Sequence, residues 1–349
     1  MLLITGSYSK ISEPGIQFYR WNGDTNFRQT GSLSGIDNPS YIAVDDSRQL
    51  LYAITEKKKD AAAELHIYQL LNTDGPKLVS CLSYEGAGSC FISCDTSGTH
   101  AFITNYGDGT LTVIGLPQAN RPGSVVQTLR FSGSGPDKER QEQSHLHAAV
   151  LSPDGQHLYC SDLGADRLYH FLYQVEASLP LLAAEKPYVE LPPGSGPRHI
   201  AISSNGKRIY LITELSGEIF VFDAQNLKDR WLQKVSLVQN GYAGKIEAAD
   251  IQLHPNGGFL YATNRGDANE ILVFQVDPIN GQLEFLQRIG AAGLSPRGIT
   301  ICEQQGLLLA ANEQSDNISI FKLLDNGLLE YTREHLQVSC PTCVKTMNI

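Results

Sequence analysis

Four polar side chains of this chain have the types needed for acid–base chemistry on an anionic substrate: His147, Arg198, Glu214 and Arg265. A histidine with a pKa near neutrality can take or give a proton. Two arginines can hold a phosphate or a carboxylate through paired hydrogen bonds and can stabilise a developing oxyanion. A glutamate can orient the histidine, receive its proton or hold a water molecule. These residues act together only if the fold brings distant parts of the chain to one place.

A repeated block of eighteen residues indicates how the fold does this. The six blocks begin at Pro39, Ser89, Leu146, Pro197, Ala248 and Pro296. Each contains an apolar alternating run, a turn such as Pro-Asn-Gly at 255–257, and a second run, with an aromatic residue at one register in five of the six. Asn-Gly and Asp-Gly between apolar runs are strong hairpin signals. Self-similarity at a fixed period means that one supersecondary unit is repeated.

The repeated unit has the features of one propeller blade. A third β-rich run follows each block, and a looser fourth strand fits before the next block. Four antiparallel strands repeated about every 50 residues are typical of β-propellers. The C-terminal CPTCVKTMNI begins a seventh unit, and MLLITGSYS and GIQFYRW at the N-terminus can supply strands that it lacks. The sequence therefore predicts an all-β, seven-bladed propeller of four-stranded antiparallel blades, a single domain over 1–349 whose last blade is closed by both termini.

Strand direction alternates within a blade, so the second and eighteenth positions of every block share one rim of the ring. The second positions hold Ser40, Cys90, His147, Arg198, Ala249, Arg297 and Thr342. The eighteenth positions hold Glu56, Tyr106, Leu163, Glu214, Arg265 and Glu313. We predict catalytic roles for the four residues named first, and substrate contacts for His145, His199, Arg297, Glu247, Asp250 and Asn105. The alternative is a rim that is simply polar, on which arginine and glutamate pair for structural reasons.

The composition excludes several classes of partner. The chain is 42% hydrophobic and 18% charged with a net charge of −10, which argues against nucleic acid or an anionic membrane as the main partner. We see no basic segment followed by a long apolar stretch at the N-terminus, and no run approaches a transmembrane length. Seven cysteines without framework spacing are typical of a reducing, cytoplasmic setting.

We expect neither a metal nor a cofactor. Cys340 and Cys343 form a lone CxxC motif without a second ligand pair. One register near the rim could offer oxygen ligands to a calcium ion, since it holds Asn105, Asp162, Asn264 and Asn312. Calcium sites usually need several carboxylates together, and these side chains are mostly amides. The sequence contains no glycine-rich phosphate loop and no GxSxG elbow.

The polar stretch SGSGPDKERQEQ, residues 132–143, lengthens the loop before the third block. We expect it to be a surface insertion, since connecting segments usually run over the surface. The alternative is a flap that covers the mouth of the ring.

Several motifs together resemble a known family. HLHAAVLSPDGQHLYCSDLGADRL, GPRHIAISSNGKRIYLITEL, LYATNR and SPRGITI are similar to segments of the seven-bladed lactonase family, and the resemblance covers essentially the whole chain. Bacterial members include the cytoplasmic 6-phosphogluconolactonase of propeller type, and a fungal branch includes the carboxy-cis,cis-muconate cyclase. The proposed site of the cyclase branch has a histidine, two arginines and a glutamate. Matched motif by motif, these are His147 in HLH, Arg198 in PRH, Glu214 in TEL and Arg265 in NR.

The resemblance implies a metal-independent, cofactor-free lactone hydrolase that acts on a small anionic sugar lactone, with 6-phospho-D-glucono-1,5-lactone of the pentose phosphate pathway as the predicted substrate. In this prediction Arg198 and Arg265 hold the substrate and His147 is the general base, while Glu214 orients His147 or passes its proton to the leaving ring oxygen. We expect a cytoplasmic monomer or weak homodimer. Two alternatives stay open: a lactonase or cyclase for another lactone, such as a muconolactone, and a non-catalytic propeller that binds a ligand or a protein.

Overall fold

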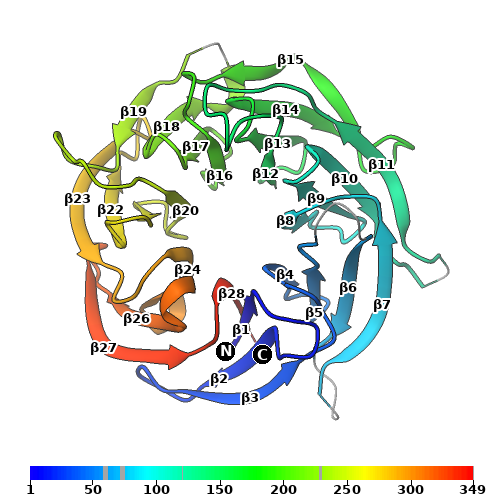
Figure 1. Ribbon diagram of the computed structural model, residues 1–349, viewed down its shortest axis with the longest axis horizontal. Helices are drawn as coiled ribbons and strands as arrows, with labels where there is room; N and C mark the ends of the chain where they lie inside the picture. Colours follow the sequence, from blue (N-terminus) through cyan, green and yellow to red (C-terminus); the bar gives the residue numbers. More distant parts are fainter. Residues whose placement is uncertain (58–61, 71–74, 120, 228–229, 349) are drawn as a thin grey trace.

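The computed structural model describes residues 1–57, 62–70, 75–119, 121–227 and 230–348. Within these residues, seven four-stranded antiparallel sheets are arranged as blades in a ring (Figure 1). Three short 3-10 helices are also described: η1 (Ala224–Asn226), η2 (Glu303–Gln305) and η3 (Glu313–Ser315). The predicted all-β class and the predicted seven-bladed architecture are therefore confirmed.

We number the blades from the first one that is continuous in sequence. Blade 1 consists of β4 (Tyr41–Asp45), β5 (Leu50–Ile54), β6 (Ala63–Gln69) and β7 (Lys77–Tyr84). Blade 2 consists of β8 (Ser89–Cys94), β9 (His100–Asn105), β10 (Thr110–Gly115) and β11 (Ser124–Arg130). Blade 3 consists of β12 (Leu146–Leu151), β13 (His157–Asp162), β14 (Arg167–Tyr173) and β15 (Leu181–Glu190).

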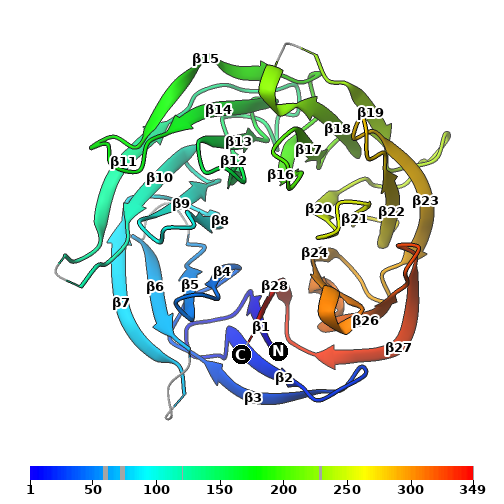
Figure 2. The same cartoon turned by 180° about the vertical axis from the view of Figure 1, so that it is seen from behind.

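The remaining blades continue around the ring (Figure 2 shows it from behind). Blade 4 consists of β16 (Pro197–Ile202), β17 (Arg208–Thr213), β18 (Glu218–Asp223) and β19 (Gln233–Ser236). Blade 5 consists of β20 (Ala248–Leu253), β21 (Phe259–Asn264), β22 (Glu270–Val276) and β23 (Leu283–Gly290). Blade 6 consists of β24 (Pro296–Cys302), β25 (Leu307–Asn312), β26 (Asn317–Leu323) and β27 (Leu329–Gln337).

Blade 7 is closed by both ends of the chain, as the sequence predicts. Its strand order is β28 (Pro341–Met347), β1 (Leu2–Ser7), β2 (Ile16–Trp21) and β3 (Phe27–Leu33). The C-terminal β28 is the innermost strand and pairs antiparallel with β1, so that Leu2 faces Met347. This pairing covers the inner edge of β1, which would otherwise be open for pairing with another chain.

The inner hairpins form where the turn signals lie. Gly206 and Gly257 follow the asparagines of two predicted turns, and both have positive φ angles, +69° and +76°. A residue with a Cβ rarely adopts this conformation, which explains the Asn-Gly sequence at these turns. The repeated block therefore corresponds to the two innermost strands of a blade and the turn between them.

The aromatic residue of the second strand joins its blade to the next one, as blades 4 and 5 show. Tyr210 in blade 4 and Tyr261 in blade 5 have no exposed surface. Their rings lie in the apolar layers between blades, while their hydroxyls donate to backbone oxygens of Gly281 at 2.9 Å and Gly327 at 2.8 Å. Each ring therefore contributes buried apolar area, and each hydroxyl keeps a hydrogen-bond partner.

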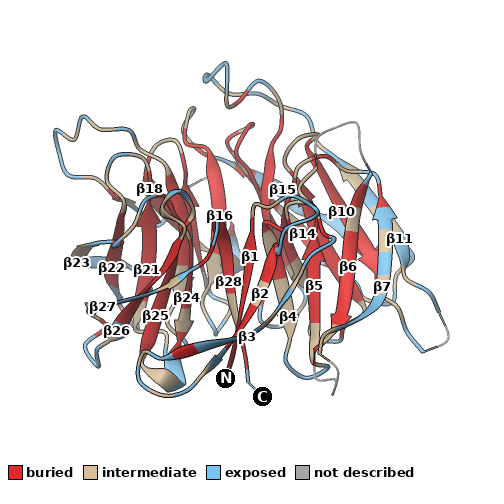
Figure 3. Cartoon of the chain, turned by 60° about the horizontal axis from the view of Figure 1, so that its bottom comes forward, coloured by how far each residue is buried: buried red, intermediate tan, exposed pale blue. Residues whose placement is uncertain are grey.

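Burial decreases from the axis of the ring toward its outside. Figure 3 shows buried residues along the inner strands and exposed residues on outer strands such as β7 and β11. Seven apolar clusters fill the spaces between adjacent blades. The inner strands are thus held rigidly from both sides, which suits them to position side chains at the central mouth.

Candidate active site on one rim of the ring

A bulge occurs at the second position of most blocks. The pairing of the two inner strands shifts between Leu146 and Ala148 in blade 3, and between Pro197 and Ile200 in blade 4. Blades 2, 5, 6 and 7 have a corresponding shift. An extra residue in one strand bends it and changes the direction of a side chain, and bulges are frequent beside active sites for this reason. His147 and Arg198 occupy these irregular positions.

Glu214 is the centre of a cluster of guanidinium groups. It follows β17 directly, and its Oε2 accepts a hydrogen bond of 2.9 Å from Nε of Arg198. Nη2 of Arg265, which follows β21, lies 3.0 Å from the same oxygen. Arg198 and Glu214 are almost wholly buried, with 2% and 3% of their surfaces exposed. The structure therefore brings three of the four predicted catalytic residues into direct contact.

A third guanidinium group comes from the loop 132–143. Nη2 of Arg140 donates to Oε1 of Glu214 and lies 3.4 Å from the hydroxyl of Tyr106. The neighbouring Gln141 is fully buried, and its amide donates two hydrogen bonds of 2.8 Å to blade 3. The loop is thus more than the surface insertion that we expected, because it carries a charged side chain into the site. Repetition could not reveal Arg140, since it lies outside the repeated blocks.

The electrostatics of this cluster favour a bound anion. Burial opposes the ionisation of Glu214, but the charges of Arg265, Arg198 and Arg140 outweigh burial and hold the pKa of its carboxyl at about 2. Burial, and next the charge of Arg265, lowers the pKa of Arg198 to about 10. At neutral pH three cations therefore share one anion. A phosphate or a carboxylate ligand would neutralise the remaining positive charge.

His147 is buried in the same mouth. Its ring centroid lies 5.9 Å from that of Tyr106 and 5.2 Å from that of His199. Burial, and next the charge of Arg198, holds the pKa of His147 well below its usual value. The imidazole is therefore neutral at neutral pH, which is the form required of a general base.

The role predicted for Glu214 requires a correction. Both of its carboxylate oxygens are held by guanidinium groups, and none of the described hydrogen bonds joins it to His147. With a pKa of about 2 the carboxyl carries no proton to pass on at neutral pH. Glu214 therefore pairs with the arginines and does not orient His147.

The two other histidines of the site have different partners. His145 stacks on Tyr106 with ring centroids 4.2 Å apart, and its Nδ1 lies 2.7 Å from the backbone oxygen of that tyrosine. Nδ1 of His199 lies 2.8 Å from Oδ1 of Asp250. Asp250 also accepts backbone N–H groups on both carboxylate oxygens, at 2.9 Å each. Its carboxylate is therefore already engaged within the protein, and the predicted contact with a substrate stays a prediction.

Two further predicted substrate contacts lie beside the cluster. Nη2 of Arg297 lies 2.7 Å from the hydroxyl of Tyr8, and its Nη1 lies 3.4 Å from Glu313. The backbone oxygen of Glu247 accepts a hydrogen bond of 3.2 Å from Nε of Arg265. Glu247 thus acts on the site through its backbone, which its residue type could not have indicated.

Asn105 is not placed to bind a ligand. Its Nδ2 donates to the hydroxyls of Thr110 at 2.8 Å and Thr112 at 3.0 Å. Its Oδ1 accepts a hydrogen bond of 2.6 Å from Ser89, and the residue has no exposed surface. The amide is satisfied within blade 2, so we assign Asn105 a structural role instead of the predicted substrate contact.

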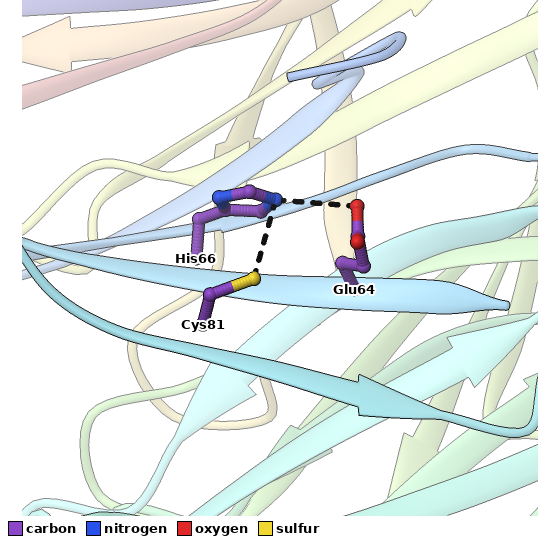
Figure 4. A group of neighbouring side chains, drawn as sticks. All are labelled: Glu64, His66 and Cys81. Carbon is purple, nitrogen blue, oxygen red and sulfur yellow. Dashed lines mark hydrogen bonds and ion pairs between the residues drawn. The ribbon is translucent and has the colours of Figure 1, made fainter. Parts of the chain in front are cut away.

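One group of three metal-ligating side chains occurs among the described residues, on the outer strands of blade 1. Glu64 and His66 in β6 lie beside Cys81 in β7 (Figure 4). Nε2 of His66 lies 3.5 Å from Glu64 and 3.8 Å from Cys81. Lys57 already pairs with Glu64 at 2.9 Å, and Nδ1 of His66 lacks the partner that metal-binding histidines usually have. We therefore interpret the group as a polar network of the outer strands.

The family model described as "Lactonase, 7-bladed beta-propeller" matches residues 2–346. The chain belongs to this lactonase family. The resemblance seen in the sequence is thereby confirmed, and a lactone hydrolase is the enzyme class that the family supports.

Similar proteins match this member of the lactonase family over nearly their whole length. The 6-phosphogluconolactonase of Bacillus subtilis is 28% identical over 348 residues, covering 98% of this chain and 97% of that protein. The 6-phosphogluconolactonase of Formosa agariphila is 28% identical over 346 residues, with 97% of each covered. The structure of the periplasmic gluconolactonase of Pseudomonas aeruginosa has a TM-score of 0.90 at 31% identity, covering 99% of each chain. In the described part of the lactonase chain, no helix is long and apolar enough to cross a membrane.

Proposed function

We propose that the protein is a 6-phosphogluconolactonase, which hydrolyses 6-phospho-D-glucono-1,5-lactone to 6-phosphogluconate. The observation that carries this proposal is the cluster of three guanidinium groups around Glu214, beside the neutral imidazole of His147. A phosphate group would neutralise the surplus charge of the cluster. The two full-length relatives named 6-phosphogluconolactonase support the same substrate. With this substrate the enzyme would act in the cytoplasm, in the pentose phosphate pathway.

In the proposed reaction a ring nitrogen of His147 takes a proton from a water molecule while the water oxygen attacks the lactone carbonyl carbon. The carbonyl π electrons move onto its oxygen, and a guanidinium group stabilises the resulting oxyanion. The carbonyl then re-forms and the bond to the ring oxygen breaks. The imidazolium returns its proton to that oxygen, so that the products are the hydroxy acid and a neutral histidine.

The arginines differ in how rigidly they are held, and this suggests a division of roles. Arg198 is buried and donates both to Glu214 and to the backbone oxygen of Ala249 in blade 5. Such a pre-organised donor suits the oxyanion, because it needs no rearrangement during the reaction. The Arg140 side chain is 35% exposed, compared with 8% for Arg265. It therefore suits a phosphate that enters from solvent.

Hydrolysis of freshly generated 6-phosphogluconolactone, corrected for the spontaneous rate, tests the proposal. We expect His147→Ala and Arg198→Lys each to lower kcat by about 100-fold, the usual contribution of a general base or of an oxyanion donor. His335→Ala is the control, because His335 is an exposed histidine of β27. Wild-type kcat in both site variants would overturn the proposal.

Unphosphorylated glucono-1,5-lactone is a second candidate substrate. It is supported by the 31% identical Pseudomonas aeruginosa protein named as a gluconolactonase. If the guanidinium cluster binds phosphate, kcat/KM should be at least about 10-fold higher for the phosphorylated lactone, since a charge-assisted hydrogen bond contributes about 1.5–3 kcal/mol. Equal values for the two substrates would contradict the phosphate assignment and leave the lactonase chemistry in place.

A further inference from the structure

Two neighbouring histidine rings in the mouth each have a buried nitrogen without a partner. His147 comes from blade 3 and His199 from blade 4, and their ring centroids lie 5.2 Å apart at an interplanar angle of 71°. Nδ1 of His147 and Nε2 of His199 are both buried, and neither has a hydrogen-bond partner among the described residues. A buried polar atom left unpaired costs about 1–3 kcal/mol, so two of them on adjacent rings require an explanation.

The protonation of His199 follows from its contact with Asp250. Oδ1 of Asp250 lies 2.8 Å from Nδ1 of His199 and accepts a backbone N–H as well. A carboxylate can only accept, so the neutral imidazole of His199 carries its proton on Nδ1. Its unpartnered Nε2 is therefore an acceptor.

The separation of the two rings allows a direct hydrogen bond between them. The pair His157 and His170 in blade 3 shows what such a bond requires: their ring centroids lie 5.0 Å apart, and Nδ1 of His157 lies 2.9 Å from Nε2 of His170. The centroids of His147 and His199 are only 0.2 Å farther apart than this. A rotation of the His147 ring that turns its Nδ1 toward Nε2 of His199 would satisfy both unpaired atoms.

We propose that Asp250, His199 and His147 form a hydrogen-bonded chain that makes His147 the base of the lactonase reaction. Nδ1–H of His147 donates to Nε2 of His199, whose Nδ1–H donates to Asp250. This leaves Nε2 of His147 with a lone pair, which takes the proton from the attacking water. The proposal rests on the proposed function. It makes His199 and Asp250 positioning residues, which supply the orientation that Glu214 does not.

The surroundings of this chain carry charges that affect its titration. Arg198 and Arg297 are positive groups near His147, and Arg198 and Lys345 are positive groups near His199. Asp250 is the negative group that opposes them at His199. The positive groups disfavour a charge on His147, and in the proposed chain the charge of Asp250 offsets part of this effect through His199 during proton transfer.

The tautomer of His147 tests the chain without any assay of activity. In 15N-histidine-labelled wild-type protein, NMR is expected to show the His147 proton on Nδ1 and an unprotonated Nε2, with the signals assigned by their loss in His147→Gln. A His147 proton on Nε2 at neutral pH would overturn the proposal. Because this measurement needs no substrate, it separates a failure of the chain from a failure of the lactonase assignment.

Kinetics of three variants provide a second test. His199→Phe keeps a ring in contact with Tyr41 and Phe91 but removes the acceptor, so we expect kcat to fall about 100-fold with KM unchanged. His199→Gln keeps an acceptor and should recover part of that loss. Asp250→Asn can hold His199 in the opposite tautomer and should lower kcat at every pH. Wild-type kcat and an unchanged pH profile in His199→Phe, with melting temperature preserved, would overturn the proposal.

Discussion

The guanidinium group of Arg140 is hydrogen bonded to the carboxylate of Glu214, although 74 residues separate them in the chain. Arg140 belongs to the loop before blade 3, whereas Glu214 follows β17 in blade 4. Arg140 also lies 3.4 Å from the hydroxyl of Tyr106, which follows the second strand of blade 2. One loop residue thus links three consecutive blades at the mouth. It also raises the number of guanidinium groups around Glu214 from two to three.

Replacing Arg140 by alanine should weaken substrate binding more than it slows chemistry. We expect KM for 6-phosphogluconolactone to rise about 10-fold or more with kcat nearly unchanged, since a charge-assisted hydrogen bond to phosphate contributes about 1.5–3 kcal/mol. Steady-state kinetics with the freshly generated lactone measures both constants.

Lys138→Ala is the matched control for this variant, because Lys138 is an exposed cation of the same loop. It should leave KM unchanged. An equal rise of KM in both variants would attribute the effect to the net charge of the loop and would contradict a contact between Arg140 and substrate.

Glu214→Gln should destabilise the protein. Three guanidinium groups, two of them buried, would lose the anion that they share, and breaking such a buried ion pair costs about 3–5 kcal/mol. Inorganic phosphate should restore part of this loss, since a ligand that binds only the folded state stabilises it. Thermal unfolding with and without phosphate measures both effects.

The control for this prediction is Glu218→Gln, which removes an ion pair with Lys234 of 2.6 Å at the surface. Exposed pairs contribute about 0–1 kcal/mol, so the melting temperature should change little. Phosphate should stabilise this variant only as much as it stabilises the wild type, because the guanidinium cluster is unchanged. If phosphate stabilised Glu214→Gln no more than Glu218→Gln, phosphate would not be replacing the lost carboxylate in the guanidinium cluster.

Local signals are enough to predict the ring from the sequence. Asp-Gly or Asn-Gly turns mark the inner hairpins of blades 3, 4 and 5, and the repeated runs of all six blocks make each assignment support the others. The seventh blade is predictable because CPTCVKTMNI matches the start of a block and GIQFYRW matches its third run; they form β28 and β2. The connections between strands do not repeat, so errors in predicting such a fold are confined to them.

The site is predictable only in part, because position in a repeat determines the backbone and not the partners of a side chain. Register places Arg198, Glu214 and Arg265 on one rim, where they are in contact. It does not show that Glu214 binds arginines instead of His147. It also cannot find Arg140, whose loop has no counterpart in the other blades. The contacts of Glu214 depend on side-chain rotamers and on the loop 132–143, which occurs only once. Neither of these leaves a periodic signal in the sequence.

Mild acid should destabilise the protein through two histidines that are neutral in the folded state. Burial lowers the pKa of His199 and that of His170 to about 4. Between about pH 6.5 and pH 4 the unfolded chain binds protons that these folded-state imidazoles do not bind, so the free energy of unfolding decreases as the pH falls. For His199, which is almost wholly buried, this decrease in the free energy of unfolding is roughly 2–3 kcal/mol by about pH 4.5. Urea unfolding across this range measures the decrease.

His199→Phe should make this pH dependence shallower, because it removes one of the shifted groups. His335→Phe is the control, since His335 is exposed in β27 and should leave the dependence as it is. A pH dependence of equal slope in wild type and in His199→Phe would mean that His199 does not titrate differently in the folded and unfolded states.

Closure of the ring by the C-terminal strand should contribute measurably to stability. Met347 has no exposed surface and packs in the apolar cluster between blades 7 and 1, together with residues such as Ile16 and Leu51. Met347→Ala should therefore lower the free energy of unfolding by about 2–5 kcal/mol, the usual cost of removing a buried methionine side chain. Asn348→Ala, at the exposed neighbouring position, should change it by less than about 0.5 kcal/mol. If denaturant unfolding gave the same midpoint for both variants, the burial of Met347 in this cluster would add nothing to the stability of the ring.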